Sequence, residues 1–480
     1  MKRAPRGALR ALFAATAAWP ARRRFATICA PTASRSSNRI LALVLTATSP
    51  PAPFASDIEH RVQLRRAVVA STIGTAIEWY DFFLYSTVTG LVFAKVFFPK
   101  SDPLVGTLEA FGVYAVGFAA RPVGAAVFGH YGDRIGRKST LIATLLLMGV
   151  ATFLVALVPT YATIGVWGAV LLTVLRFVQG VGVGGEWGGS ILLSMEWARS
   201  SGSRGFVASL PQLGVPCGLV LANVTVLAFS RLSGDQFLVW GWRVPFSLSL
   251  VLVAIGLYIR LGIEETPVFR RVVAERQVVR RPVLDVIRQQ PRAIGLSALV
   301  RMGEQAPQYI FTAFIFAYGT GTLGVSRDFL LASVVVAQVL SFGTIPLAGH
   351  ISDLVGRRKV YVAGAALMGV FGFVYFWLLN TRSPALIFVA ILLAVIPHGL
   401  MYGPQAALIA ELFPGRVRYS GASLGYQLAS LIAGGPAPLI AAWLLARTHS
   451  STPIAIYILA CAVISLGATA ILPDRAVAAA

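Results

Sequence analysis

Charged side chains inside long apolar runs are the residues of this chain best suited to chemistry. Glu78 and Asp81 stand three positions apart, and so do Arg301 and Glu304. On a helix this spacing places both members of a pair on one face. In hydrocarbon each such group costs at least a few kcal/mol, so its presence needs a reason. The remaining members of this set are Arg121, Arg176 and Glu186.

The acids suit proton carriage, and the arginines suit the capture of carboxylates. A low dielectric favours the neutral form of a carboxyl group, so its protonation can respond to a modest gradient. A guanidinium binds a carboxylate through two hydrogen bonds. We therefore expect Glu78, Asp81 or Glu304 to couple transport to protons. The expected substrate-binding residues are Arg301, Arg121, Arg176, Gln405 and Tyr85.

Structural roles compete with these functional ones. Interhelical ion pairs would hold a bundle together, and the glycine-rich surroundings of Glu186 favour that interpretation for this residue. His398 and Gln405 lie in one apolar run, where a lone polar group often serves only to join helices. Both interpretations stay open for the charged set.

The elements that must position these residues are membrane-spanning helices. Of the 480 residues 56% are hydrophobic and only 12% are charged, whereas soluble proteins carry about 25% charged residues. Apolar runs near the ~20 residues that cross a bilayer follow one another along the chain. We predict twelve spans, at 67–93, 105–129, 140–158, 164–194, 206–229, 241–260, 293–319, 329–349, 360–379, 385–410, 419–446 and 453–472.

The predicted fold class is an all-α membrane protein with twelve transmembrane helices in two six-helix halves. Residues 59–260 form the first half, 261–292 a charged, partly amphipathic linker, and 293–480 the second half. Residues 1–58 are rich in arginine, contain serine and hold no acid before Asp57, which is the composition of a transit peptide. We favour a disordered leader, or a start codon assigned too far upstream, because the pattern of the mature chain begins near Asp57.

Basic residues in the connections predict the orientation. Counted from His60, twenty-two Lys and Arg lie on the side that includes 261–292, and six lie on the other side. Basic connections stay in the cytoplasm, so both termini are expected there, in a multi-pass protein of the inner membrane. The net charge of +22 therefore needs no nucleic-acid partner.

A polar motif occurs twice, at 129–138 and at 349–358. Both copies read Gly-x-x-x-Asp-x-x-Gly-Arg followed by a basic residue, and two copies in register predict two related halves. We expect glycines that allow a tight turn between helices, and an aspartate, Asp133, that caps a helix end. The residues expected to latch a gate are Gly129, Asp133, Arg134, Gly136, Arg137, Lys138, Glu196, Gly349, Asp353, Gly356, Arg357, Arg358 and Glu411.

The repeated motif resembles the signature of the major facilitator superfamily, and the match runs from about Arg61 to the C-terminus. Within it the chain resembles the metabolite:proton symporter family. The second copy of the superfamily motif departs from the first at one position, where Leu354 stands in place of Arg134. This resemblance implies proton-coupled import of a small organic acid, shikimate-like or a related carboxylate, by a monomer. It rests on the segments 78–82, 121–124, 176–180, 184–189, 235–246, 411–414 and 416–421, and on Arg301 with Glu304.

Other functions were weighed against symport. An antiporter, an exporter or another metabolite permease on the same scaffold stays open, and so does a transporter-like sensor that binds a ligand without moving it. The sequence holds no phosphate-cradling loop and no cluster of His and Cys, and its three cysteines are widely spaced. We therefore expect no enzyme activity, no metal and no cofactor. The expected partners are the organic acid, protons and the lipid bilayer.

Overall fold

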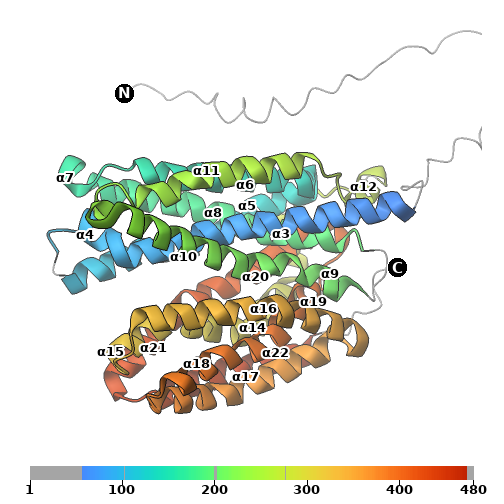
Figure 1. Ribbon diagram of the computed structural model, residues 1–480. Coiled ribbons are helices and arrows are strands. Elements are labelled where there is room, and N and C mark those ends of the chain that lie inside the picture. The colour runs from blue at the N-terminus through green and yellow to red at the C-terminus, as the bar shows by residue number, and fades with distance from the viewer. Residues whose placement is uncertain (1–56, 102, 199–202, 276, 473–480) are drawn as a thin grey trace, which may run out of the picture. The chain divides into compact units, whose positions relative to one another are not determined.

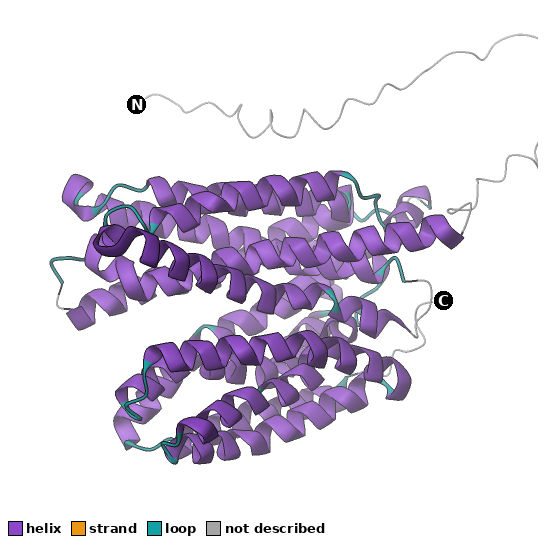
Figure 2. Cartoon of the chain, in the orientation of Figure 1, coloured by secondary structure: helices purple, strands orange, loops and turns teal. Residues whose placement is uncertain are grey.

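The computed structural model describes residues 57–101, 103–198, 203–275 and 277–472, and every regular element in these ranges is helical (Figures 1 and 2). The predicted leader, residues 1–58, lies outside them except for its last two residues, which begin the first described helix. In Figure 1 the helices from α3 to α11 run side by side, and so do those from α14 to α22.

The elements before the linker include long helices over the first six predicted spans and short helices in the connections between them. They are α3 (Asp57–Val88), η1 (Thr89–Phe93), α4 (Ala94–Phe97), α5 (Pro103–Ile135), α6 (Arg137–Leu157), α7 (Tyr161–Ile164), α8 (Trp167–Met195), α9 (Arg204–Ser209), η3 (Pro211–Leu213), α10 (Gly214–Ser233), η4 (Gly234–Leu238) and α11 (Arg243–Leu261). The predicted linker contains two short helices, α12 (Pro267–Ala274) and α13 (Pro282–Gln289).

The elements after the linker include long helices over the second six predicted spans and one short helix, η6, in a connection between them. They are α14 (Pro291–Tyr309), η5 (Ile310–Phe314), α15 (Ile315–Gly321), α16 (Arg327–Val355), α17 (Arg357–Asn380), α18 (Pro384–Leu393), α19 (Val395–Ala410), η6 (Gly415–Val417), α20 (Arg418–Ala429), η7 (Ser430–Gly434), α21 (Pro436–Thr448) and α22 (Thr452–Ile471). The division into halves at 59–260 and 293–480 stays a prediction.

Helices suit this composition because a backbone in lipid must satisfy its own hydrogen bonds. Among the described residues ten helical segments are long and apolar enough to cross a membrane. The two predicted spans outside that set contain α3 and α14, and they are the spans that carry the charge pairs Glu78/Asp81 and Arg301/Glu304. The same residues that make these helices candidates for function lower their hydropathy.

Proline positions break several spans. The predicted fifth span is interrupted by η3, which starts at Pro211, and the tenth is divided at Ala394, three residues before Pro397. A π-helical segment, η7, precedes Pro436 in the eleventh span. Because proline lacks an amide hydrogen, a neighbouring turn must change its pairing. Ser430, the first residue of η7, accepts a hydrogen bond from Arg301 on α14 at 3.0 Å.

The structure corrects the prediction that the repeated motif is a polar loop. Helix α5 continues through His130 and Asp133 to Ile135, and α16 continues in the same way to Val355. Only Gly136 and Gly356 leave the helix, with φ of 113° and 104°, a backbone region that glycine adopts without strain. We call the end of the bundle where α5 and α16 terminate the motif end.

Candidate functional site

A pocket is lined by residues from both sets of helices. Arg301 and Glu304 reach it from α14, Trp79 and Phe83 from α3, and His398 from α19. Its remaining lining residues are Val215, Gln305, Gln308, Tyr309, Thr312 and Tyr402. The pocket therefore combines one buried cation, one buried acid, one imidazole and several aromatic rings.

Arg301 is held rigidly in the wall of this pocket, with 2% of its surface exposed. Its Nη1 donates to the carbonyl of Tyr426 at 2.9 Å and to the hydroxyl of Ser430 at 3.0 Å. Its Nε donates to Oε1 of Gln405 at 3.4 Å, and the guanidinium lies 3.2 Å from the centroid of the Tyr426 ring. These contacts fix the plane of the guanidinium, as carboxylate recognition requires.

Glu304 is the counterion of Arg301, since its Oε2 lies 3.5 Å from Nε of that residue. Gln405 donates to the same carboxylate at 3.2 Å, and Nε2 of His398 lies 3.2 Å from Oε1. The structure thus brings together three predicted site residues: Arg301, Glu304 and Gln405. Gln405 bridges the charged pair and is fully buried behind it, outside the pocket lining.

The acids of α3, Glu78 and Asp81, are also buried, and neither is among the residues that line the pocket. Oδ2 of Asp81 accepts a hydrogen bond from the Thr152 hydroxyl at 2.9 Å, whereas its Oδ1 is buried and has no hydrogen-bond partner among the described residues. Gln179 donates to Thr152 at 2.8 Å and accepts from Arg176 at 3.3 Å. Asp81 and Arg176 are therefore joined through two intermediates, Thr152 and Gln179, which the sequence analysis missed. Both are polar residues inside predicted spans, and that signal could have found them.

Three predicted binding residues lie outside the pocket lining: Arg121, Arg176 and Tyr85. The two arginines pack against aromatic rings instead. The Arg176 guanidinium lies 4.2 Å from the ring centroid of Tyr85, and that of Arg121 lies 4.5 Å from Phe118. The Phe118 ring in turn lies 5.7 Å from Tyr309, which lines the pocket. Aromatic side chains thus stand between these two arginines and the pocket, and their role in substrate binding stays a prediction.

Glu186 has a structural partner that the sequence analysis missed. It forms a buried ion pair with Arg260, and it accepts hydrogen bonds from Thr144 at 2.9 Å and Ser190 at 3.0 Å. A side chain at Gly74 would collide with the Arg260 guanidinium, so the glycine makes room for the pair. Arg260 is the last residue of the predicted span 241–260, and the sequence alone does not indicate its partner. These contacts favour the structural role for Glu186.

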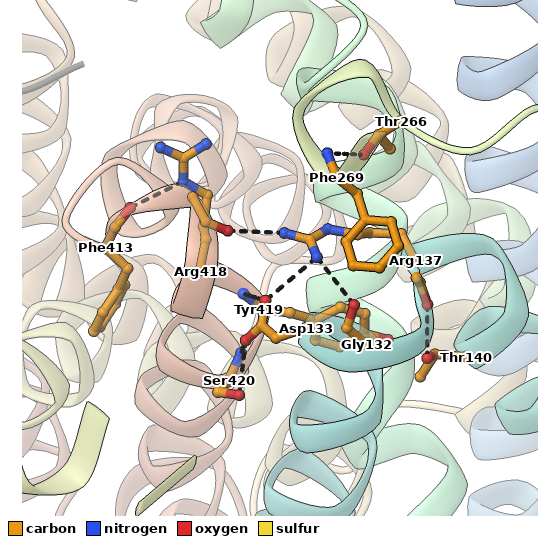
Figure 3. A network of polar contacts seen from close by, with 12 residues as sticks. Gly132, Asp133, Arg137, Thr140, Thr266, Phe269, Phe413, Arg418, Tyr419 and Ser420 are labelled. Carbon is orange, nitrogen blue, oxygen red and sulfur yellow. Dashed lines mark hydrogen bonds and ion pairs between the residues drawn. The ribbon is translucent and has the colours of Figure 1, made fainter. Parts of the chain in front are cut away.

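The repeated motif joins the two sets of helices at the motif end (Figure 3). Asp133 accepts hydrogen bonds from the backbone amides of Tyr419 at 3.2 Å and Ser420 at 2.9 Å, in the first turn of α20. Asp133 caps a helix end as predicted, but the helix belongs to the other set. Gly129 and Gly132 permit this contact, because a side chain at either would collide with Ser420 or Tyr419.

Three further residues complete what we call the first latch. Arg137 lies 3.4 Å from Asp133 and 3.5 Å from Glu196, and it donates to the carbonyl of Gly415 at 3.0 Å. Arg418 lies 3.7 Å from Glu196. Glu196 also accepts a hydrogen bond from Thr266 at 2.6 Å, which docks the linker helix α12 against the latch.

The second latch is the counterpart made by the other copy of the motif. Asp353 accepts hydrogen bonds from the amides of Gly205 at 2.9 Å and Phe206 at 2.8 Å, in the first turn of α9. Arg357 lies 3.4 Å from Asp353 and pairs with Glu411. Burial raises the pKa of Glu411, and the Arg357 guanidinium opposes that rise. Gly349 lies against Gly205 and Ser209 and allows the close approach.

The remaining motif residues make contacts within their own set of helices. Arg134 lies 3.3 Å from His130, and Lys138 donates to the carbonyl of Leu261 at 2.9 Å. Arg358 donates to the carbonyl of Leu472 at 3.4 Å. Arg134, Lys138 and Arg358 are therefore not part of either latch.

We expect Asp133→Asn to slow transport about 5- to 30-fold while leaving substrate affinity unchanged. The amide weakens the cap on α20, and losing a cap costs about 0.5–2 kcal/mol, which changes the population of the latched state. Initial uptake rates and equilibrium substrate binding measure the two quantities. Asp328→Asn, an exposed acid in the first turn of α16, is the matched control. Normal turnover with lost binding would contradict a gating role.

Comparison with known proteins identifies the family. The Major Facilitator Superfamily profile matches residues 71–434. An inner membrane metabolite transport protein of Escherichia coli, YhjE, is 44% identical over 386 residues, which cover 79% of this chain and 87% of that protein. The shikimate transporter of the same organism is 40% identical over 418 residues, covering 85% of this chain and 94% of the transporter. These relatives are transporters and not enzymes.

Solved structures agree on the fold. The proton:xylose symporter XylE, bound to 6-bromo-6-deoxy-D-glucose, superposes with a TM-score of 0.73. It shares 17% sequence identity, and the match covers 86% of this chain and 97% of the symporter. The predicted fold class, an all-α membrane protein of the major facilitator type, is confirmed.

Proposed function

This chain belongs to the Major Facilitator Superfamily of membrane transporters, and we propose that it is a proton-coupled symporter that imports a small organic acid. The observation that carries this proposal is the pocket containing Arg301. Its guanidinium is buried, oriented by Tyr426 and Ser430, and paired with an acid that a substrate carboxylate can replace. The shikimate transporter as a relative supports a shikimate-like or related carboxylate.

The surroundings of Arg301 support the same substrate class. Trp79, Phe83, Tyr309 and Tyr402 line the pocket with flat apolar faces, and the pocket must widen before the ring of a cyclic acid can pack against them. A carboxyl among Glu78, Asp81 and Glu304 takes part in proton coupling, since these buried acids lie in the spans that border the pocket.

Alternating access follows from the latches. Both latches are formed at the motif end, so this end is held shut by contacts between α5 and α20 and between α16 and α9. For the substrate to leave on this side, the carboxylates of Asp133 and Asp353 must release those helix ends. The two sets of helices then rock about the pocket, as transporters built from repeats do.

Uptake into proteoliposomes tests the proposal. Purified chain is reconstituted and given labelled shikimate and other small carboxylic acids, with and without an inside-alkaline pH gradient. We expect accumulation above the outside concentration only with the gradient. Equilibration without accumulation would make the chain a facilitator, accumulation under the reversed gradient an antiporter, and binding without uptake a sensor.

The proposed orientation places both termini and the motif end in the cytoplasm of a bacterial inner membrane, because the basic connections lie on that side. We expect cysteines introduced at Ile135 and Arg271 to resist a membrane-impermeant thiol reagent added to intact cells. Both positions are exposed, as are Lys100 and Arg382 in the opposite connections. Cysteines at Lys100 and Arg382 should react, and the reverse pattern would overturn the orientation.

A further inference from the structure

His398 is the histidine that faces the pocket, and its neighbours give it a defined role. It lies in α19 between Pro397 and Gly399 and is 6% exposed. Its Nε2 stands 3.2 Å from Oε1 of Glu304, and its ring stacks on that of Tyr402 with the centroids 5.0 Å apart. Imidazole is the side chain whose ordinary chemistry changes charge between pH 5 and 8.

The groups that face the Glu304–His398 pair come from four helices. Arg301 on α14 is the cation within ion-pair distance of Glu304 among the described residues. Tyr361 on α17 reaches the pair through Gln405, whose Nε2 lies 3.5 Å from the tyrosine hydroxyl. Tyr426 on α20 lies under Arg301, and Tyr402 is on the same helix as His398. The tyrosines stay neutral near pH 7, so three groups decide the local charge: Arg301, Glu304 and His398.

Substrate binding changes this balance. Arg301 and Glu304 neutralise one another, so charge balance in the empty pocket needs no proton on His398. A carboxylate that takes the guanidinium of Arg301 adds one negative charge to a buried site. An uncompensated buried charge is costly, and a single proton on the nearest titratable base removes it.

We propose that His398 is that base. When a substrate carboxylate binds Arg301, the Glu304 carboxylate leaves Arg301 and pairs with a protonated His398. One proton then enters with each monoanion. The proton comes from the outside solution and forms one N–H bond on the imidazole. It leaves to the inside solution when the substrate departs and Glu304 returns to Arg301. This inference rests on the proposed function and specifies which group couples it to protons.

The binding of substrate and proton is then reciprocal. Because protonated His398 favours the bound carboxylate, the carboxylate must favour the proton to the same extent. Shikimate affinity should therefore fall as pH rises from 6 to 8, by up to about tenfold per unit in the limit of one linked proton. Carboxylic acids of this kind are fully ionised over that range, so the dependence reports on the protein.

His398→Gln tests the inference, because glutamine keeps a hydrogen-bond donor for Glu304 but takes up no proton. The full chain is reconstituted, and the carboxylic acid that wild type accumulates, shikimate first, serves as the probe. We expect the variant to bind the probe more weakly than wild type and with an affinity independent of pH, to retain counterflow exchange at saturating probe, and to lose accumulation under an inside-alkaline gradient. His350→Gln, an exposed histidine at the motif end, should behave as wild type.

Each other outcome has a stated meaning. A His398→Gln variant that still accumulates the probe overturns the inference and leaves the proposed function standing. Loss of exchange together with accumulation, in both His398→Gln and His398→Asn, places His398 in substrate binding and also overturns it. A wild type that accumulates none of the acids overturns the proposed function, and the inference falls with it.

Discussion

Arg301→Lys is expected to raise the KM for the substrate carboxylate about 10- to 100-fold. Lysine keeps the charge but cannot form two parallel hydrogen bonds with a carboxylate, and it cannot stack on Tyr426 as the guanidinium does. A charge-assisted hydrogen bond contributes about 1.5–3 kcal/mol, and every 1.4 kcal/mol corresponds to tenfold in affinity. Initial uptake rates over a range of substrate concentrations measure the change.

Arg176→Lys is the matched comparison, since Arg176 is equally buried but lies under Tyr85 and outside the pocket lining. We expect its KM to change much less than that of Arg301→Lys. The opposite ranking would move the carboxylate site to the helices before the linker and contradict the assignment of Arg301.

Glu304→Gln is expected to abolish accumulation while counterflow exchange continues. The amide cannot hold the negative charge that keeps a protonated His398 in place, so the substrate no longer brings a proton with it. Exchange needs no net proton movement and therefore survives. The accumulation ratio should fall to about one, measured together with exchange in the same vesicles.

Asp81→Asn and Glu78→Gln provide the comparison for Glu304→Gln, because all three acids were predicted to be candidate proton carriers. We expect neither of them to separate accumulation from exchange. If Asp81→Asn alone gives that separation, the proton is carried on α3. Its binding atom would then be Oδ1 of Asp81, which has no hydrogen-bond partner among the described residues. If all three amides lose both activities, the acids are structural ion-pair partners.

Much of the fold was predictable because hydropathy and charge patterns are local. Twelve apolar runs predicted helices that the structure contains, and the family expected from the repeated motif is confirmed. The end of α5 was misjudged, since His130 and Asp133 are polar enough to suggest a loop. They continue the helix because α20 of the other set covers that turn and supplies partners for the Asp133 carboxylate.

The site was predictable in its residues but not in its pairings. Sequence spacing placed Arg301 and Glu304 on one face of a helix, and the structure pairs them. It could not place His398 against Glu304, because these residues are 94 positions apart and meet only when α14 packs against α19. The partnership of Glu186 with Arg260 was hidden for the same reason.

Symport with protons is the central claim, and the pH inside the vesicles tests it most directly. Proteoliposomes containing a trapped pH indicator receive an inward gradient of shikimate, or of the acid that the chain accumulates, with no imposed pH gradient. The account predicts that the lumen acidifies as the labelled substrate enters, that protein-free vesicles acidify much more slowly, and that His398→Gln takes part only in exchange. Substrate entry through the chain with no pH change, or with a lumen that becomes alkaline, would contradict symport.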